Sequence, residues 1–393
     1  MGQFRFLTAG ESHGKGLVAV IEGMVAGLPV SEDYITQDLK RRQAGYGRSA
    51  RMKIEQDKAE VISGVRHGLT IGSPISLLIW NRVWEDWQEI MSIAPVGKKI
   101  QPITTPRPGH TDLVGVIKYC VEDIRLILER ASARETAARV AVGAVARRFL
   151  DEFGITIHSH TISIGKHLAK RPRSINWKQV EKSPIRCADA TTEKAIMAAI
   201  DKAKAEEDTL GGVFEVIAAG VPVGLGSHVQ WDRRLDGQIA QAIMSIPAVK
   251  GVEIGTAFSV ANSKGSQAQD VIETSPKGTA LPWHRATNNA GGIEGGISNG
   301  QPLVIRAAVK PIATLGKPLP SVDLRTGKKT EAHYERSDIC VVPAAGVIGE
   351  AMLAIVLTNA MLEKFGGDHL KETWANYKNY IGSAYSRKRY AKS

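Results

Sequence analysis

Two histidines in short loops are the residues of this chain best suited to proton transfer. His13 lies in the segment 10–14 (GESHG), and His110 lies in the segment 107–112 (RPGHTD). Histidine titrates near neutral pH and can donate or accept a proton at modest cost. Proline and glycine make the second loop stiff and tightly turned, and Arg107 could hold an anion beside His110. Taken alone, the first segment could equally be a turn with a surface histidine.

Two familiar interpretations of the first loop fail. Ser12 and His13 are adjacent, and neighbouring side chains of an extended segment point to opposite faces, so they cannot form a nucleophile and base pair with each other. The spacing from Gly10 to Lys15 is one residue shorter than the phosphate-binding P-loop pattern, and no Ser or Thr follows the lysine. The loop is therefore not a P-loop.

Four arginines interleaved with glycines follow in the segment 41–51 (RRQAGYGRSAR). Glycine lets the backbone approach a ligand, and arginine presents a planar fork that suits carboxylate and phosphate oxygens. The alternative is a solvated basic loop or a nucleic-acid patch, but Tyr46 alone offers little surface for stacking bases. The pattern favours an anion clamp.

Two helices are apolar on every face, which predicts that both are buried. Ser132 and Glu135 form a capping box at the start of the first, which runs from Thr136 to Leu150. Its N-terminus, after Arg130 and Ala131, favours a phosphate, although a simple N-cap needs no ligand. The second runs from about Gly346 to Lys364, with Gly366 placed to end it.

The glycine-rich segment 285–300 is irregular and should wrap a ligand, but it lacks the strand and helix context of a dinucleotide fingerprint. The segments 310–314 (KPIAT) and 335–338 (ERSD) complete the set of unusual loops. His158 and His160 lie two residues apart on an expected strand without a third ligand, which indicates a structural or exposed position rather than a metal site.

Composition points to a folded protein in the cytoplasm. Hydrophobic residues make up 43% of the 393 residues and charged residues 23%, which is ordinary for globular proteins. We find neither a signal peptide nor an uninterrupted apolar stretch of membrane length. Cys120, Cys187 and Cys340 lack disulfide or metal spacing and are expected to be buried thiols. The net charge of +11 is partly due to a basic tail, residues 376–393, expected to be poorly ordered and only a weak candidate for nucleic-acid binding.

Two motifs recur in the same order and predict an internal duplication with halves of about 1–160 and 212–366. AGLPV at 26–30 returns as AGVPV at 219–223, and the glycine pattern of 64–75 returns at 292–303. Strands are expected at 74–80, 213–218 and 302–309. We predict one α+β domain, residues 1–375, in which antiparallel sheets enclose the apolar helices, with the lysine-rich segment 166–208 at the periphery. Chance similarity of glycine loops is the alternative.

Taken in order, these motifs resemble the chorismate synthase family over nearly the whole chain. The resemblance implies anti 1,4-elimination of phosphate from 5-enolpyruvylshikimate 3-phosphate, the last common step of the shikimate pathway. This lyase reaction requires reduced FMN without net redox change. The resemblance also implies a β-α-β sandwich and a homotetramer. From the composition and spacing given above, we expect no metal, membrane or nucleic acid. The substrate carries two carboxylates and a phosphate, which accounts for the arginines.

The resemblance also implies roles for individual residues. His13 would assist phosphate departure, His110 would control protonation of the reduced flavin, and Asp338 would adjust the proton at flavin N5, which receives the C6 hydrogen. Substrate contacts would come from Ser12, Arg42, Arg48, Arg51, Arg107, Arg134 and Arg336. Flavin contacts would come from Arg130, Ala131, Ser132, Pro247, Ala248, Gly295, Lys310, Pro311, Ile312, Ala313, Thr314 and Arg336.

Three questions stay open at this point. Arg42 and Arg48 suit NADP as well as the substrate, so NADPH could serve as the indirect reductant of the flavin. A flavin oxidoreductase would use similar glycine loops but would consume reductant in proportion to product. A basic nucleic-acid binder would lose affinity steeply with salt.

Overall fold

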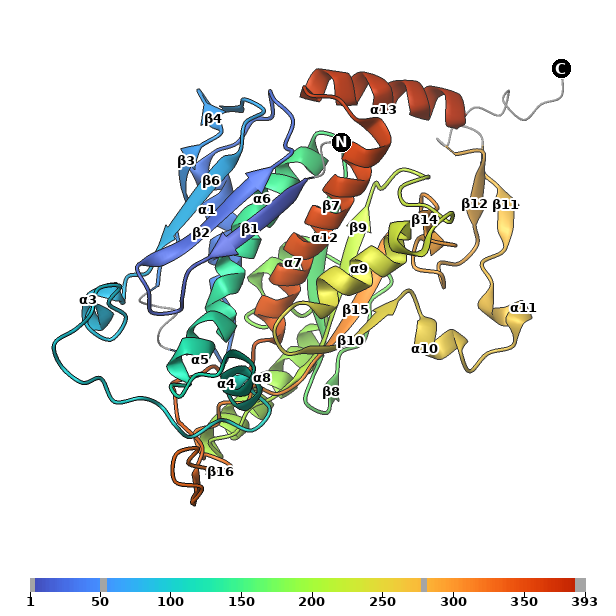
Figure 1. Cartoon of the computed structure of the whole chain (residues 1–393). Helices are drawn as coiled ribbons and strands as arrows, with labels where there is room; N and C mark the ends of the chain where they lie inside the picture. The colour runs from blue at the N-terminus through green and yellow to red at the C-terminus, as the bar shows by residue number, and fades with distance from the viewer. Residues whose placement is uncertain (1–3, 50–54, 277–280, 386–393) are drawn as a thin grey trace.

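Two antiparallel sheets enclose a layer of helices, as predicted (Figure 1). The computed structural model describes residues 4–49, 55–276 and 281–385. The first sheet has the order β1-β2-β6-β3, with the bounds Arg5–Ala9, Gly16–Glu22, Ile75–Trp80 and Glu60–Ser63. The second has the order β10-β15-β9-β7-β8, with the bounds Val249–Ile254, Leu303–Val309, Gly212–Ala219, Thr156–Ile164 and His167–Leu168. The three expected strands are therefore confirmed as β6, β9 and β15.

The two apolar helices pack on each other between the sheets. Helix α6 (Thr136–Asp151) lies against β2 and β6, and α12 (Val342–Phe365) lies against β7 and β9. Gly143 permits their close approach, because a Cβ there would lie 2.3 Å from the Cβ of Ala351. Helix α12 is long and apolar enough to cross a membrane, but 94% of its apolar window is buried inside the protein. It is a core helix, and Gly366 ends it as expected.

The remaining elements surround this core. The helices are α1 (Glu32–Gln43), α3 (Trp84–Trp87), α4 (Asp112–Tyr119), α5 (Arg125–Ala131), α7 (Trp177–Lys182), α8 (Ala190–Ala205), α9 (Leu235–Met244), α10 (Ala257–Val260), α11 (Gly265–Ala268) and α13 (Leu370–Ala384). Short hairpins are formed by β4 and β5 (Val65–Arg66, Leu69–Thr70), β11 and β12 (Ile272–Thr274, Trp283–Arg285), β13 and β14 (Ile293–Glu294, Ile297–Ser298), and β16 and β17 (Pro320–Val322, Lys329–Glu331). The 3₁₀ turns are η1 (Ala133–Glu135) and η2 (Trp231–Arg233).

The two halves of the chain have the same element order. With the shorter intervening elements left out, the order is β1, β2, α1, β3, β6 and α6 in the first half and β7, β9, α9, β10, β15 and α12 in the second. Both sheets then share one strand order, because β1-β2-β6-β3 corresponds to β7-β9-β15-β10. The repeated glycines also share a conformation, with positive φ at Gly64, Gly68, Gly72, Gly292, Gly296 and Gly300.

The other repeated motif is out of register by four residues. Thr70 and Ser298 are equivalent, because the hydroxyl of each makes the same two hydrogen bonds. It donates to the carbonyl of one residue and accepts from the N–H of the residue three positions after that one. For Thr70 the partners are Val25 O and Leu28 N; for Ser298 they are Pro222 O and Leu225 N. Leu28 therefore corresponds to Leu225 and not to Val221, as the AGLPV and AGVPV strings had suggested. The second of these strings begins at the last residue of β9.

Four local predictions need correction. The expected tail is helical up to Ala384, because Trp374 and Tyr377 of α13 pack on Phe153; the basic residues beyond 385 lie outside the described part of the chain. Cys120 is exposed, whereas Cys187 and Cys340 are buried. Ser132 caps the 3₁₀ turn η1 before α6 and not α6 itself. Helix α8 buries Ile196, Ile200 and Ala203, so its segment is only partly peripheral.

Candidate active site

His13 is held by a glutamate from α5. Its backbone N–H donates to Glu129 Oε2 at 2.8 Å, and its ring Nδ1 lies 2.9 Å from Glu129 Oε1. The ring stacks on Trp87, with centroids 3.9 Å apart, and Arg125 lies over the same indole at 4.9 Å. Because Nδ1 is engaged by the carboxylate, only Nε2 of this ring can act on a ligand.

His110 has a similar partner. Its Nδ1 lies 2.5 Å from Asp112 Oδ1, and Arg107 makes a bidentate pair with the same carboxylate at 2.8 and 3.1 Å. Arg107 Nη2 also lies 3.1 Å from His110 Nδ1. A nitrogen that donates to a carboxylate cannot also accept from a guanidinium, so we interpret that contact as proximity. Burial would raise the pKa of Asp112, but its bonds to His110 and Arg107 hold that pKa below its usual range.

A chain of alternating charges joins the two histidines. Arg125 Nη1 donates to Glu129 Oε1 at 3.0 Å, and Glu335 lies 3.9 Å from both Arg125 and Arg107. Burial opposes ionisation of Glu335, but His333, Arg107 and Arg125 lower its pKa overall. Since the 3.9 Å contacts are long, a ligand anion could replace Glu335 beside these two arginines.

Three of the expected ligand-binding arginines are buried, and two of them, Arg42 and Arg134, are bonded to the scaffold around the start of α6 and not to a histidine loop. Arg42 is 3% exposed and donates to Thr136 Oγ1 and to the carbonyl of Ala133. Arg134 is 4% exposed and donates to Asp57 Oδ1 at 2.6 Å and to Asn81 Oδ1 at 2.9 Å. Burial is the main cause that lowers the pKa of Arg42 to about 10; the nearby Arg134 acts in the same direction, and Asp57 opposes it. Both guanidinium groups tie the start of α6 to its surroundings.

Asn81 carries this buried network to the first histidine loop. Its amide nitrogen donates to the carbonyls of Glu11 and Gly14, at 3.0 and 2.8 Å. Ser12 is 2% exposed and its hydroxyl lies 3.2 Å from that of Ser132. The conformation of the loop is therefore set by hydrogen bonds from Asn81, directly after β6, and from Ser132, between α5 and η1, and not by local glycine geometry alone.

Asp338 lies at the edge of a small cavity. The cavity has a volume of about 190 Å³ and is lined by Lys204, Glu207, Thr209, Thr314, Gly316, Tyr334, Ser337, Asp338 and Ile339. Arg48 pairs with Asp338 at 2.9 Å, and the N–H of Ser49 donates to the same carboxylate. Arg336 is exposed and has no hydrogen bond or ion pair to the described residues. Arg51 lies outside the described residues.

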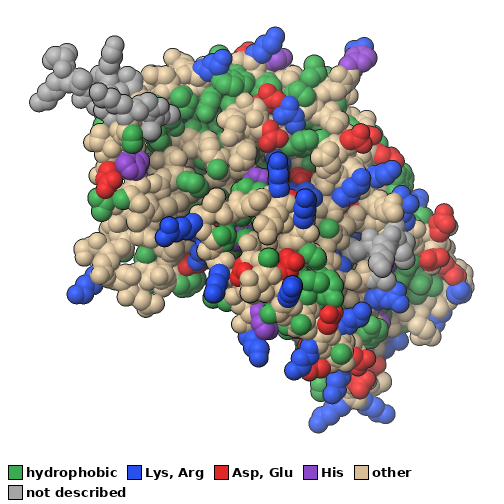
Figure 2. Space-filling view, turned by 180° about the vertical axis from the view of Figure 1, so that it is seen from behind, with side chains coloured by type: hydrophobic (Ala, Val, Ile, Leu, Met, Phe, Trp, Pro, Cys, Tyr) green, Lys and Arg blue, Asp and Glu red, His purple; other side chains and the backbone are tan. Residues whose placement is uncertain are grey.

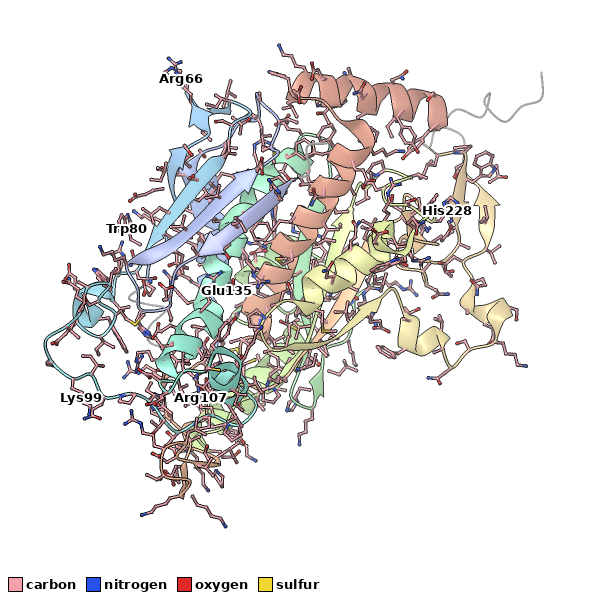
Figure 3. The ribbon with its side chains drawn as sticks, viewed as in Figure 1. Arg66, Trp80, Lys99, Arg107, Glu135 and His228 are labelled. Atoms are coloured by element: carbon pink, nitrogen blue, oxygen red, sulfur yellow. The ribbon has the colours of Figure 1, made fainter. Side chains whose placement is uncertain are left out.

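The segment 310–314 contacts both the second histidine loop and the residue just before the start of β10. Arg107 Nη1 donates to Thr314 Oγ1 at 2.9 Å, and Lys310 Nζ donates to the carbonyl of Gly109. The N–H of Lys310 donates to the carbonyl of Ala248, which has φ +69°. A left-handed alanine is unusual and occurs most often at sites that need a special backbone shape. Arg107 and Glu135 lie towards the same end of the helical layer (Figure 3).

The structure separates one predicted flavin contact from the rest. Gly295 is in the turn between β13 and β14, and the carbonyl of the next residue, Gly296, accepts from Leu235 at the start of α9. Pro247 and Ala248 follow the other end of this helix. Since α9 has 10 residues, the two groups lie about 15 Å apart along its axis. Arg130 is closer to the histidines, because it donates to the carbonyls of Thr8 and Gly10.

Sequence reasoning missed the carboxylates that hold the histidines. Glu129 forms an i,i+4 pair with Arg125, a pattern that is visible in the sequence but usually marks a solvated helix face. Asp112 lies two residues after His110, so its role could have been inferred from the loop. Glu335 lies in the segment 335–338 that the sequence analysis selected, although its place between the two histidines was not predicted, and Asp57 carries no local signal. His158 and His160 are structural as predicted: His158 stacks on Trp177 and His160 is buried against Glu215.

Comparisons with known proteins agree on one family. The family model described as chorismate synthase matches residues 4–362. Chorismate synthases of Solibacter usitatus and Aquifex aeolicus are each 54% identical, over 96% of this chain and 98% and 97% of their own lengths. A crystal structure of a chorismate synthase superposes with a TM-score of 0.77 at 44% identity, covering 97% of this chain and 98% of that one. The chain belongs to the chorismate synthase family.

Proposed function

We propose that this protein converts 5-enolpyruvylshikimate 3-phosphate into chorismate and phosphate by anti 1,4-elimination, with reduced FMN as cofactor. The observation that carries the proposal is the pair of histidines, each with Nδ1 against a carboxylate, joined through Arg125, Glu335 and Arg107. Carboxylates at Nδ1 fix each imidazole so that Nε2 is the nitrogen that transfers a proton. A site of this kind suits loss of an anionic leaving group next to several bound anions.

His13 is the residue that we assign to the departing phosphate. As an imidazolium it would give its Nε2 proton to a phosphate oxygen as the C–O bond breaks. The neutral ring would keep the proton on Nδ1, where it is hydrogen-bonded to the carboxylate of Glu129. Its ring is only 15% exposed and stacked on Trp87. The ring therefore has little freedom to turn away from a bound substrate.

The arginines divide into two groups. Arg48, Arg107 and Arg336 are our candidates for the carboxylates and phosphate of the substrate, together with Arg125, which sequence reasoning had not selected. Arg107 also donates to buried Asp112, but it lies beside His110 and Glu335. Arg42 and Arg134 donate instead to scaffold groups around the start of α6. We assign them to positioning Ser12, His13 and the start of α6. Ser12 itself remains a candidate hydrogen-bond donor to the substrate.

The residues expected to hold FMN have suitable chemistry. Arg336 is an exposed cation, Thr314 and Asp338 line one cavity, and Ala248 keeps a left-handed backbone against Lys310. Glu135 is 7% exposed, and its Oε1 has no partner among the described residues, so it can accept from a flavin N–H or hydroxyl. When bound, reduced FMN would supply transient electron density and accept the C6 hydrogen. Asp338 would hold or release a proton beside it, and His110 would control protonation from the other loop.

Gly295 can contact the flavin only if it comes from a second copy of the chain or if its hairpin moves. We propose that the protein is cytoplasmic and forms a homotetramer. The argument for association is that the outer face of the first sheet is apolar and exposed. Its uncovered side chains include Leu7 at 79%, Ile62 at 61% and Trp80 at 51% exposure, with Val18 and Val20 beside them. Trp80 lies on the outer side of the sheet in Figure 3. Light scattering after gel filtration gives the assembly, and Trp80→Glu should shift it to smaller species.

A direct assay tests the proposed reaction. The purified protein is mixed anaerobically with 5-enolpyruvylshikimate 3-phosphate and chemically reduced FMN, and phosphate and chorismate are measured together, with oxidised FMN as control. Equimolar products with reduced FMN alone support the elimination. Consumption of reductant in proportion to product would instead favour a flavin oxidoreductase. Repeating the assay with oxidised FMN and NADPH decides whether the protein uses NADPH to reduce its own flavin.

The nucleic-acid alternative has little support from the surface. Figure 2 shows basic and acidic side chains interspersed on one face, without a continuous basic stripe. A nucleic-acid binder would lose affinity steeply as salt rises, in proportion to the phosphates that it neutralises. If the protein binds an RNA oligomer only weakly even at low salt, this alternative is rejected.

A further inference from the structure

We propose that Glu129 is the positioning residue of His13 and that it keeps the proton of the neutral ring on Nδ1. This inference deepens the proposed function and rests on the proposed role of His13 in the elimination. Glu129 is 3% exposed, and its carboxylate meets both the backbone N–H and the ring Nδ1 of His13. Its own carbonyl also accepts from the N–H of Ser12 at 3.0 Å.

The direction of the hydrogen bonds follows from the donors available. An ionised carboxylate only accepts, so the nitrogen of His13 that faces it must carry the proton. Arg125 donates to Oε1 at 3.0 Å, the oxygen that Nδ1 approaches most closely. The carboxylate therefore accepts from an arginine, a ring nitrogen and a backbone amide.

The surroundings leave the ring no equivalent alternative. A half-turn of the imidazole about its Cβ–Cγ bond would move Nδ1 away from Glu129 and place a carbon there. The stack on Trp87 limits tilting of the ring, and the cation–π contact of Arg125 holds the indole in place. Glu129, Arg125 and Trp87 together fix both the orientation and the tautomer of His13.

A histidine tautomer measurement tests this without substrate or flavin. The full-length protein is labelled with ¹⁵N-histidine, and the His13 signals are those that vanish in His13→Ala. In the parent, we expect the proton of the neutral ring to lie on Nδ1. In Glu129→Gln we expect the proton to distribute between both nitrogens. A parent-like Nδ1 form in Glu129→Gln would overturn the inference.

Kinetics supply the second arm. Glu129→Gln should lower kcat by about 10- to 100-fold, less than complete loss of a general acid, which costs roughly 10² to 10⁴. KM should stay within about threefold, and the alkaline limb of the pH profile should move to lower pH, because the imidazolium has lost its negative partner. Glu129→Asp, which keeps the charge, should restore part of the rate and of the Nδ1 form.

The control is Glu152→Gln, at the residue directly after α6. Glu152 forms the same i,i+4 pair with an arginine, Arg148, but without a histidine, so its kcat and pH profile should match the parent. An unchanged pH profile in Glu129→Gln would reject the positioning role even if kcat fell. If His13→Ala kept full turnover, the proposed catalytic role of His13 would fail, whereas the tautomer result for Glu129 would stand on its own.

Discussion

The Nδ1 of His110 lies 2.5 Å from the carboxylate of Asp112, two residues further along the same loop. Asp112 is fully buried and also pairs with Arg107. We predict that Asp112→Asn lowers turnover by about 10²-fold, because His110 and Arg107 lose the charge that orients them. Steady-state phosphate release at saturating reduced FMN measures this.

The matched control for this change is Asp236→Asn. Asp236 accepts a bidentate pair from Arg234 in the same way, but near the start of α9 and without a histidine. Its turnover should stay within about twofold of the parent, since exposed ion pairs contribute little. Equal losses in both variants would mean that the Asp112 effect is a general consequence of breaking an arginine pair.

Asp338 gives a second prediction at the other edge of the site. Asp338→Asn should slow C6–H cleavage by about 10- to 100-fold if its carboxylate handles a proton beside the flavin. Its pair with Arg48 and its bond from Ser49 N–H would weaken, but FMN affinity should change little. A substrate deuterated at C6 and a fluorescence titration of FMN separate the two effects. Loss of FMN affinity without an increased isotope effect would make Asp338 a binding residue.

Much of the fold was predictable because hydrophobic patterns are local. Most residues of α6 and α12 are apolar and buried, and β6, β9 and β15 are short runs rich in β-branched residues. The loops with His13 and His110 were visible from residue type alone. The register of the AGLPV repeat was not, because two similar strings can fall at different points after a strand, and only the hydrogen bonds of Thr70 and Ser298 reveal which residues correspond.

The site was less predictable because its partners are distant in the chain. His13 and Glu129 are separated by 116 residues, so no local spacing links them. Arg42 seemed a loop ligand, yet α1 extends through Gln43 and places it on the buried stripe of Ile35 and Leu39, at i, i+4 and i+7. That stripe was the signal for its burial. Because Gly45 and Gly47 follow closely, the sequence suggested that Arg42 already lay in a loop, whereas the helix continues through Gln43.

Glu350 is the centre of a buried ion network between the halves. Its carboxylate contacts Arg41 at 2.8 Å, Arg147 at 2.5 Å and Arg186 at 3.1 Å, and it is fully buried on α12. Burial alone would raise the pKa of Glu350, but these arginines hold it below its usual range. Glu350→Gln should lower the free energy of unfolding by about 3–5 kcal/mol, because three buried cations lose one anion.

Urea denaturation at neutral pH measures this loss. The control is Glu363→Gln on the same helix, whose pair with Arg233 is half exposed on both sides and should cost less than about 1 kcal/mol. A loss for Glu350→Gln no larger than that of the control would show that water or rearranged acids replace the missing charge.

Glu215 gives a prediction about acid stability. It is fully buried on β9 and accepts from His160, Arg171 and Arg306. Burial would raise its pKa, but His160 and the arginines lower the pKa of Glu215 to about 2. The folded pKa is depressed, so the stabilisation is complete above the unfolded value of about 4.3 and is lost as the pH falls towards 2.

At neutral pH Glu215→Gln should cost about 2–3 kcal/mol, and the difference from the parent should shrink below about pH 4. Urea denaturation at several pH values, with the exposed Glu22→Gln as control, measures both. A difference that stays constant down to pH values near 3 would mean that Glu215 contributes by packing and not by its charge.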